Sequence, residues 1–326
     1  MILSEKITAA WWLMSTVAVL ACWRWLADPA GMLLTHGKIA VLMTLSYYTG
    51  RWLMQRTDLG LLLRVGTPLA MLVWWYSETY DFCSTMPYLD HWFARADEWL
   101  FGGQACLHFA AALPSKAWSE AMNLGYYSFF PLQAAVLLYY YARRRHEFEL
   151  AGFVILASFL LFYLVYSTLP VAGPQFYFDA IGTDCAARGV FPEVGRYFAT
   201  HRDMLTPPGD PDGFFYQIVK NGQARGEFPT AAFPSSHIGC TVVYMLLAWR
   251  ASRRLFAAML PVCVLLALST VYIQAHYVID TFAGLLCGAA MYYFLKKWGK
   301  RLASSDFCRT FAPANEQESV GAIAQL

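Results

Sequence analysis

The stretches FPSSH (Phe233–His237) and STVYIQAHYVID (Ser269–Asp280) lie among apolar segments that are long enough to cross a bilayer. They place His237, His276 and Asp280 at membrane depth, where ionisable side chains are costly and indicate a functional site. If a helix begins by His276, Asp280 follows at i+4 on the same helical face, where a carboxylate can hold one imidazole nitrogen and leave the other free. The pattern predicts an imidazole base oriented by a carboxylate.

Pro234 and Ser235 predict the start of a helix, because proline has no backbone N–H to donate and serine is a common N-cap. His237 then falls in the first helical turn. The free N–H groups at a helix N-terminus favour an anion. We expect that anion to be a phosphate.

The two motifs resemble those of the type 2 phosphatidic acid phosphatase and vanadium haloperoxidase superfamily, which carries Pro-Ser-Gly-His and, further on, Ser-Arg-x5-His-x3-Asp. Ser235 and His237 match the first motif. Ser269, His276 and Asp280 match the second. The resemblance implies that His276, aligned by Asp280, attacks phosphorus to form a phosphohistidine while His237 protonates the leaving oxygen, without a metal or another cofactor.

The chain departs from that pattern at Ser236, where glycine is usual, and at Thr270, where a phosphate-binding arginine is usual. The superfamily's earlier Lys-x6-Arg-Pro motif has no match. Ser-Thr-x-Tyr, His-Tyr-x-x-Asp and Phe-Pro-Ser-x-His are similar instead to the inositol phosphorylceramide synthase branch, which transfers a phosphorylated head group between lipids. His237, His276 and Asp280 are also residue types that bind zinc, but the sequence offers no convincing additional protein ligands to complete a zinc site.

The composition indicates an integral membrane protein. Of 326 residues, 58% are hydrophobic, a larger share than in most soluble domains. Only 14% are charged, a smaller share than in most soluble domains. The formal net charge of +2 is too small to suggest a nucleic-acid partner. The expected partners are the membrane, a phospholipid donor and a lipid acceptor.

Apolar runs predict about eight transmembrane helices, since about 20 residues at 1.5 Å per residue span ~30 Å of hydrocarbon. The expected fold is an all-α membrane protein with a six-helix phosphatidic-acid-phosphatase-type core, two extra N-terminal helices and a long extracytoplasmic loop. The sequence divides into N-terminal helices (1–58), the membrane domain (59–301) and a polar tail (302–326). The predicted spans are Ile7–Leu26, Gly37–Met54, Leu59–Tyr76, Glu120–Tyr141, Leu150–Leu169, His237–Trp249, Leu255–Tyr272 and Tyr277–Leu295.

Basic residues lie in alternate connections, which predicts that this face is cytoplasmic, with both termini inside and the site on the extracytoplasmic side. A bacterial inner membrane or an equivalent membrane is expected. The basic residues are Arg51, Arg56, Arg64, Arg143, Arg144, Arg145, Arg250, Arg253, Arg254, Lys296, Lys297, Lys300 and Arg301.

Long segments occupy the other face. Between Ser77 and Ser119, aromatic and acidic residues predict an interfacial helix with a glycine stop, in which Asp90 and Asp97 share one face as solvated or capping groups. The range Pro170–Pro234 is rich in Pro and Gly and predicts an irregular lid.

The candidate phosphate-binding residues come from the motifs and from this lid. Gln175 stands where the resembling branch often has an arginine, and it can donate hydrogen bonds without bringing charge. Cations from the lid could balance the phosphate; Lys220 and Arg225 are preferred over Arg188, Arg196 and Arg202 because they precede the motif most closely. The full set is Ser235, Ser236, Ser269, Gln175, Lys220 and Arg225.

The remaining histidines and the cysteines show no metal-ligand spacing. Surface or head-group positions are expected for His36, His91, His108, His146 and His201. A disulfide among Cys83, Cys106 and Cys185 on the outer face is left open, and packed thiols are expected for Cys22, Cys240, Cys263, Cys287 and Cys308.

Three functions are compatible with these features. The first is a lipid phosphotransferase that moves an inositol-phosphate-like head group from a phosphodiester lipid to a hydroxyl-bearing lipid such as a ceramide. The second is a phosphatase acting on a lipid or polyprenyl phosphate. The third is a non-catalytic transporter, whose paired halves and broken helices are not apparent in the sequence.

Overall fold

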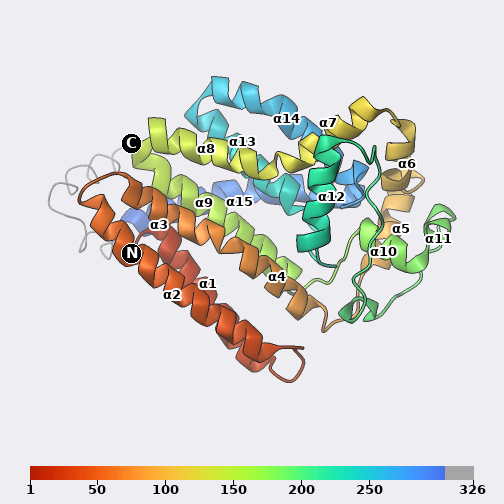
Figure 1. Cartoon of the computed structure of the whole chain (residues 1–326), viewed down its shortest axis with the longest axis horizontal. Coiled ribbons are helices and arrows are strands. Elements are labelled where there is room, and N and C mark those ends of the chain that lie inside the picture. Colours follow the sequence, from red (N-terminus) through yellow and green to blue (C-terminus); the bar gives the residue numbers. More distant parts are fainter. Residues whose placement is uncertain (305–326) are drawn as a thin grey trace.

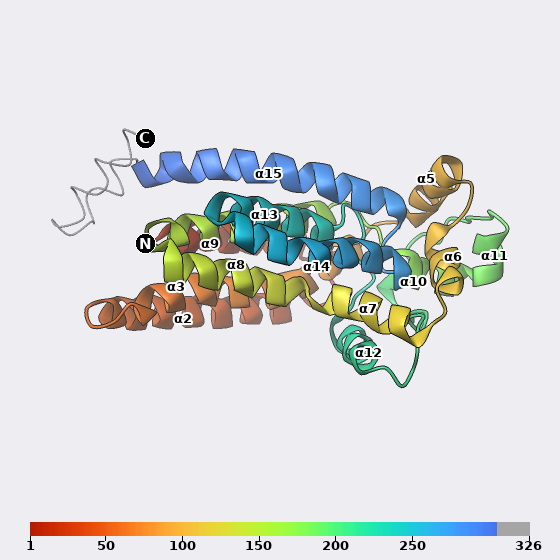
Figure 2. The same cartoon turned by 90° about the horizontal axis from the view of Figure 1, so that it is seen from above.

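The computed structural model describes residues 1–304, which are helical and contain no β-strand (Figure 1). The helices of the bundle lie along its long axis, and shorter helices gather at one end (Figure 2). The bundle consists of α1 (Leu3–Ala21), α2 (Pro29–Met54), α3 (Leu59–Ala70), α4 (Leu72–Cys83), α8 (Phe129–Arg143), α9 (Arg145–Tyr166), α13 (Ser236–Ala251), α14 (Arg253–Tyr272) and α15 (Val278–Ser304). The shorter elements are α5 (Asp90–Phe101), α6 (Ala105–Ala112), α7 (Lys116–Tyr127), α10 (Pro174–Ile181), α11 (Thr183–Ala187), η1 (Tyr197–Ala199) and α12 (Phe214–Gly226).

Helix α9 forms the centre of the bundle. Every residue from Ala151 to Leu160 is buried, as expected for a helix that is apolar on all sides. It packs against α1, α3, α4, α8, α13 and α15. Helices α13 and α15, which begin at the two sequence motifs, therefore rest on one shared core.

Four helical stretches are long and apolar enough to cross a bilayer: Leu59–Cys83, Arg145–Tyr166, Arg253–Tyr272 and Val278–Ala303. They coincide with the third, fifth, seventh and eighth predicted spans. The other four predicted spans are also helical, but among residues 1–304 they do not meet both criteria. The protein is an all-helical membrane protein, and the count of eight spans stays a prediction.

Two of the predicted spans differ in extent from the helices of the structure. Helix α2 begins at Pro29, eight residues before the predicted Gly37, because the Asp28 side chain caps it by accepting a hydrogen bond from the Gly31 amide at 2.9 Å. The predicted span from Glu120 to Tyr141 is divided at Ser128 into α7 and α8.

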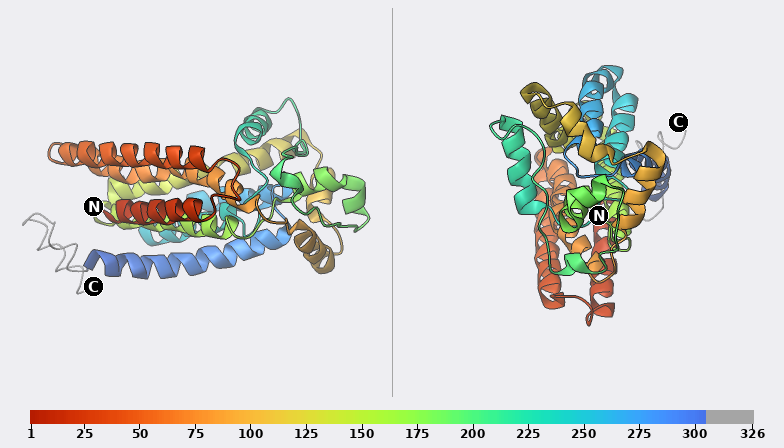
Figure 3. Two further views of the ribbon diagram at one scale, coloured as in Figure 1. Left: turned by 90° about the horizontal axis from the view of Figure 1, so that it is seen from below. Right: turned by 90° about the vertical axis from the view of Figure 1, so that its right-hand side faces the viewer.

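The two ends of the bundle differ in chemistry. The shorter helices lie at one end, together with the starts of α13 and α15, which carry the sequence motifs (Figures 2 and 3). The α8–α9 and α13–α14 connections, which carry the basic clusters, lie toward the other end (Figure 2). Which end is cytoplasmic stays a prediction. The polar tail lies outside the described residues, apart from the last residues of α15.

The lid between Pro170 and Pro234 is more regular than predicted. It contains α10, α11, η1 and α12, because its prolines fall where helices tolerate them: Pro174 is the first residue of α10, and its missing N–H would have no helical partner there. Helix α12 is fastened to α7, since Glu120 accepts hydrogen bonds from the amides of Phe215 (3.0 Å) and Tyr216 (3.1 Å). The lid is thus a packed layer of short helices.

The N-terminal helices belong to the same bundle. Helix α1 packs on α9, and Glu149 accepts a hydrogen bond from the Leu3 amide at 2.6 Å. Arg64 is buried and donates to both carboxylate oxygens of Glu5, at 2.6 and 2.8 Å. Its charge is therefore neutralised inside the protein instead of facing lipid head groups.

Two of the five remaining histidines contradict the predicted surface position. His36 is buried, with Nε2 2.9 Å from a Glu78 carboxylate oxygen and Nδ1 2.9 Å from the Thr16 hydroxyl. His91 is also buried, 3.6 Å from Glu193. The sequence placed His36 near a segment end, whereas the early start of α2 brings it inside the helix. His108, His146 and His201 are exposed, as predicted.

The cysteines of the described residues are free thiols. Cys83 and Cys106 are buried and Cys185 is partly exposed, and none of the three forms a disulfide. Of the predicted packed thiols, Cys240 and Cys263 are buried, and Cys22 and Cys287 are partly buried. Cys308 lies outside the described residues.

Candidate active site

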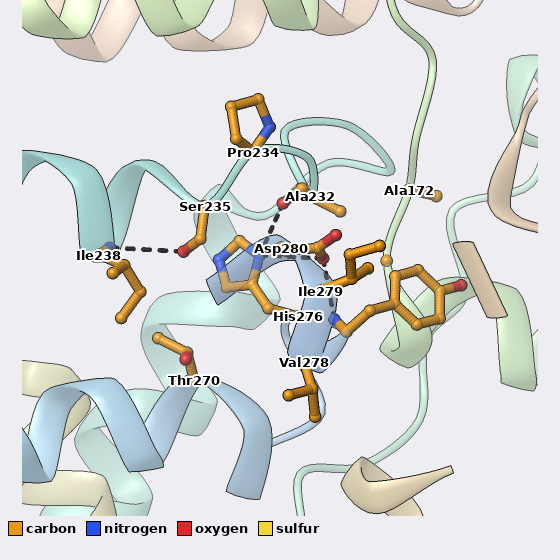
Figure 4. Close-up of polar contacts among 12 residues, drawn as sticks. Ala172, Ala232, Pro234, Ser235, Ile238, Thr270, His276, Val278, Ile279 and Asp280 are labelled. Atoms are coloured by element: carbon orange, nitrogen blue, oxygen red, sulfur yellow. Dashed lines mark hydrogen bonds and ion pairs between the residues drawn. The ribbon is translucent and has the colours of Figure 1, made fainter. Parts of the chain in front are cut away.

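His276 lies in the short connection between α14 and α15, next to the start of α13 (Figure 4). Its Nδ1 is 2.8 Å from the backbone carbonyl oxygen of Ala232. Because a carbonyl only accepts, Nδ1 carries the proton in this arrangement. Nε2 forms no hydrogen bond with any described residue, so it is left with a free lone pair.

Asp280 is close to His276, but it is not the hydrogen-bond partner that the sequence predicted. Its Oδ2 lies 3.6 Å from Nδ1 and accepts a hydrogen bond from the Tyr277 amide at 2.8 Å. Helix α15 begins at Val278, so His276 precedes the helix and the i+4 geometry is not helical. Asp280 therefore lies beside the imidazole and holds the Tyr277 backbone, while the Ala232 carbonyl fixes the tautomer of His276.

His237 occupies the first turn of α13, as predicted. Ser235 is the N-cap, and its hydroxyl accepts a hydrogen bond from the Ile238 amide at 3.4 Å. The rings of His237 and His276 are 5.7 Å apart between centroids. Tyr126 stacks on His237 with 4.7 Å between centroids, so the imidazole is held between an aromatic ring and the second histidine.

Two buried aspartates of α5 fix the loops around His276. Asp90 accepts hydrogen bonds from the Ala172 amide (2.9 Å) and the Gly173 amide (2.8 Å). Asp97 accepts from the first amides of α15, Val278 (2.8 Å) and Ile279 (2.9 Å). Both were predicted as solvated or capping groups; Asp97 caps α15, whereas Asp90 binds loop amides that precede α10, and both are fully buried, at 0% exposure. Burial raises the pKa of Asp90 to about 6.

Gly173 lies where three site segments meet. Its φ is +97°, which favours glycine, and a Cβ there would lie 2.8 Å from the Ala275 carbonyl oxygen and 3.2 Å from the Ala232 Cβ. Ala275 precedes His276, and the Ala232 carbonyl accepts the hydrogen bond from its Nδ1. A side chain at this position would therefore displace His276.

We expect Gly173→Ala to lower turnover by about 100-fold, because a shift of order 1 Å in a reacting group costs that much. Gly182→Ala is the matched control, since Gly182 has φ +84° and a Cβ added there would meet no atom within 4 Å. It should cost roughly 1–3 kcal/mol of backbone strain and leave activity near normal. Steady-state kinetics of both variants would distinguish them; equal activity would show that the close approach at Gly173 does not position His276.

Glu227, at the end of α12, was not singled out from the sequence. Its two carboxylate oxygens accept hydrogen bonds from the hydroxyls of Tyr76 (3.0 Å) and Tyr126 (3.1 Å). Burial raises the pKa of Glu227, and the hydrogen bonds from Tyr76 and Tyr126 oppose that shift, with a smaller contribution from His276. In the sequence it is marked only as a charged residue ten positions before His237, with no other charged residue between the two.

Burial also lowers the pKa of His276, to about 4. Desolvation disfavours the charged imidazolium, and the hydrogen bond to the Ala232 carbonyl and the charge of Glu227 only partly oppose this effect. At neutral pH His276 is therefore a neutral imidazole with Nε2 unprotonated. That is the form in which an imidazole can act as a nucleophile.

The other predicted residues divide into those at the site and those engaged elsewhere. Ser236, the first residue of α13, is partly exposed beside His237, and its first-turn amide has no intrahelical acceptor. The hydroxyls of Ser269 and Thr270 bond to the carbonyls of Leu266 (2.7 Å) and Ala267 (2.9 Å) within their own helix.

The predicted lid residues do not contact the histidines. Gln175 is buried and accepts a hydrogen bond from Gln223 of α12 at 3.0 Å, so it ties α10 to α12. Lys220 and Arg225 are exposed on α12, with the Lys220 ammonium 5.9 Å from the Tyr216 ring centroid. Their role in phosphate binding stays a prediction. Among residues 1–304, no lysine or arginine forms a hydrogen bond or an ion pair with His237, His276, Asp280 or Glu227.

The all-helical membrane fold and the buried pair of neighbouring histidines define the class of a membrane-embedded protein with a candidate catalytic site. A family model described as the PAP2 superfamily matches residues 91–294, and the chain belongs to this superfamily. The match confirms the superfamily predicted from the motifs, and it covers both histidines, Asp280 and Glu227. No curated protein and no solved structure matches the chain. The protein is accordingly a membrane enzyme of the lipid phosphatase and phosphotransferase type.

Proposed function

We propose that the enzyme transfers a phospho-head group from a phosphodiester lipid to a hydroxyl-bearing lipid through a phosphohistidine at His276. One observation carries this proposal: a neutral His276 with a free Nε2 lies beside a second histidine, and among the described residues no lysine or arginine forms a hydrogen bond or an ion pair with either histidine. A phosphodiester carries one negative charge and a phosphomonoester up to two. A site whose histidines have no bonded cation suits the diester better.

The first half-reaction forms the bond between Nε2 of His276 and phosphorus and breaks the bond from phosphorus to the donor lipid oxygen. His237 donates a proton to that departing oxygen. Positive charge develops on the His276 ring as the bond forms, and Asp280, 3.6 Å from Nδ1, stabilises it. The amides of the first turn of α13 and the hydroxyls of Ser235 and Ser236 would hold the non-bridging oxygens.

In the second half-reaction the acceptor hydroxyl attacks phosphorus, gives its proton to His237 and releases His276. Water competes with the acceptor at this step, and a transferase must exclude it. Glu227 accepts hydrogen bonds from Tyr76 and Tyr126 and so links α12 to α4 and α7. These links support a site that is closed to water while the phosphohistidine exists. An inositol-phosphate-like head group and a ceramide-like acceptor are the expected substrates.

The test compares the rate of head-group transfer with the rate of phosphate release. Purified protein in lipid vesicles should move a head group from a phosphodiester lipid to a hydroxyl-bearing lipid faster than it releases inorganic phosphate from phosphatidic acid. His276→Asn protein, prepared in the same way, supplies the background for both rates. Rapid phosphate release with no head-group transfer for any donor and acceptor would favour a lipid phosphatase and would overturn the transferase proposal.

We also propose that the active site is extracytoplasmic and that both termini are cytoplasmic, on the basis of the basic residues at the opposite end of the bundle. Asp212 and His146 are exposed at the two ends. In a variant without Cys22, Cys185, Cys287 and Cys308, an Asp212→Cys thiol should react with an impermeant maleimide from outside intact cells, and a His146→Cys thiol should not. The reverse labelling pattern would contradict this orientation.

A further inference from the structure

The end of the bundle opposite the active site contains two adjoining hollows. One, of about 390 Å³, lies between α13, α14 and α15 and is lined by Leu246, Trp249, Arg250, Tyr292 and Lys296. The other, of about 680 Å³, lies between α8 and the start of α14 and is lined by Tyr139, Arg143 and Arg254. Arg253 lines both hollows. Neither hollow includes a residue of the candidate active site.

These hollows hold more positive charge than the protein neutralises. Arg250 donates to both carboxylate oxygens of Glu147, at 3.0 and 3.1 Å. Among the described residues, Arg143, Arg253, Arg254 and Lys296 form no ion pair with a carboxylate, although Glu147 and Asp58 pair with other arginines nearby. Four cations without a carboxylate partner around one pair of hollows favour an anionic ligand there.

Aromatic rings and apolar helix faces border the same cations. The guanidinium of Arg253 lies over the Trp249 ring, 3.0 Å from its centroid. Trp249 and Tyr293 are themselves exposed. Further exposed apolar side chains lie along α14 and α15 toward the active-site end, including Leu260 and Val264 on α14 and Leu286 on α15. A charged hollow that opens beside lipid-facing helix surfaces matches a phosphate head group with acyl chains attached.

We propose that these hollows bind the head group of an anionic phospholipid, whose phosphate contacts Arg253 and Lys296 and whose acyl chains lie along α14 and α15. The bound lipid joins the ends of α13, α14 and α15. The opposite ends of the same helices carry His237, Thr270 and Asp280. The lipid therefore stabilises the packing of the three helices that hold the active site, whichever reaction the site performs.

The test compares two double variants. Arg253→Gln/Lys296→Gln removes two cations of the hollows, and Arg51→Gln/Arg56→Gln is the matched control. Arg56 also lies over an exposed tryptophan, 3.9 Å from the Trp52 ring centroid, but neither Arg51 nor Arg56 lines the hollows. All four side chains are at least partly exposed, so both variants should fold, and thermal unfolding in neutral detergent checks this.

Native mass spectrometry should find one phospholipid retained by the wild-type protein, with about tenfold preference for phosphatidylglycerol over phosphatidylcholine. The control variant should keep this preference, and Arg253→Gln/Lys296→Gln should lose it. Phosphatidylglycerol should also raise the unfolding temperature of the wild type more than millimolar inorganic phosphate does. An equal preference in all three proteins, or an equal effect of inorganic phosphate alone, would overturn the lipid site.

Discussion

Replacing His276 with asparagine should reduce turnover by about 10⁴-fold or more, because removal of a covalent nucleophile leaves only the catalysis due to binding and electrostatics. Asparagine is the informative substitution here. Its side-chain amide can donate to the Ala232 carbonyl as Nδ1 does at 2.8 Å, so the loop before α15 keeps its anchor. Head-group transfer by the purified variant in vesicles measures the effect.

The matched control for this prediction is His108→Asn, since His108 is exposed on α6 and takes no part in the candidate site. It should retain wild-type activity. Both variants should unfold at temperatures close to that of the wild type. Substantial turnover in a correctly folded His276→Asn protein would remove His276 from the role of nucleophile.

The second large effect is expected for Asp280→Asn, with a loss of about 10³-fold in turnover. The asparagine oxygen can still accept the hydrogen bond from the Tyr277 amide, which Asp280 Oδ2 accepts at 2.8 Å, so the fold of the connection should survive. What is lost is the negative charge 3.6 Å from Nδ1, which stabilises the imidazolium that develops during attack. Single-turnover kinetics should show that formation of the phosphoenzyme, and not substrate binding, is slowed.

Asp97→Asn distinguishes this charge effect from a structural one. Asp97 caps the amides of Val278 and Ile279 at the start of the same helix, but no contact joins its carboxylate to His276. Its asparagine variant should lose stability and retain more turnover than Asp280→Asn. If the two variants lost equal turnover and equal stability, Asp280 would act as a structural cap only.

The sequence predicted the features of the fold and site that depend on local chemistry. The N-cap at Ser235, the position of His237 in the first turn and the long apolar helices follow from residue types and spacing. It also identified the superfamily, because two motifs of fixed spacing are a specific signal.

What the sequence missed depends on contacts between distant segments. The acceptor for Nδ1 of His276 is a backbone carbonyl 44 residues earlier, which no side-chain pattern encodes. Asp90 and Asp97 share a helical face as predicted, but their partners lie more than 80 residues away. Glu227 was missed for the same reason, since Tyr76 and Tyr126, which bind its carboxylate, come from two other helices.

The phosphohistidine itself is the central claim, and it can be trapped. His237→Ala protein should still react with a head-group phosphodiester whose leaving group is an aryl oxide, because such a group departs without an acid. The variant lacks the base for the second half-reaction, so the intermediate should accumulate. Rapid quenching in alkali followed by peptide mass spectrometry should locate the head-group phosphate on His276. Release of the aryl oxide with no covalent adduct, or an adduct on another residue, would contradict the mechanism.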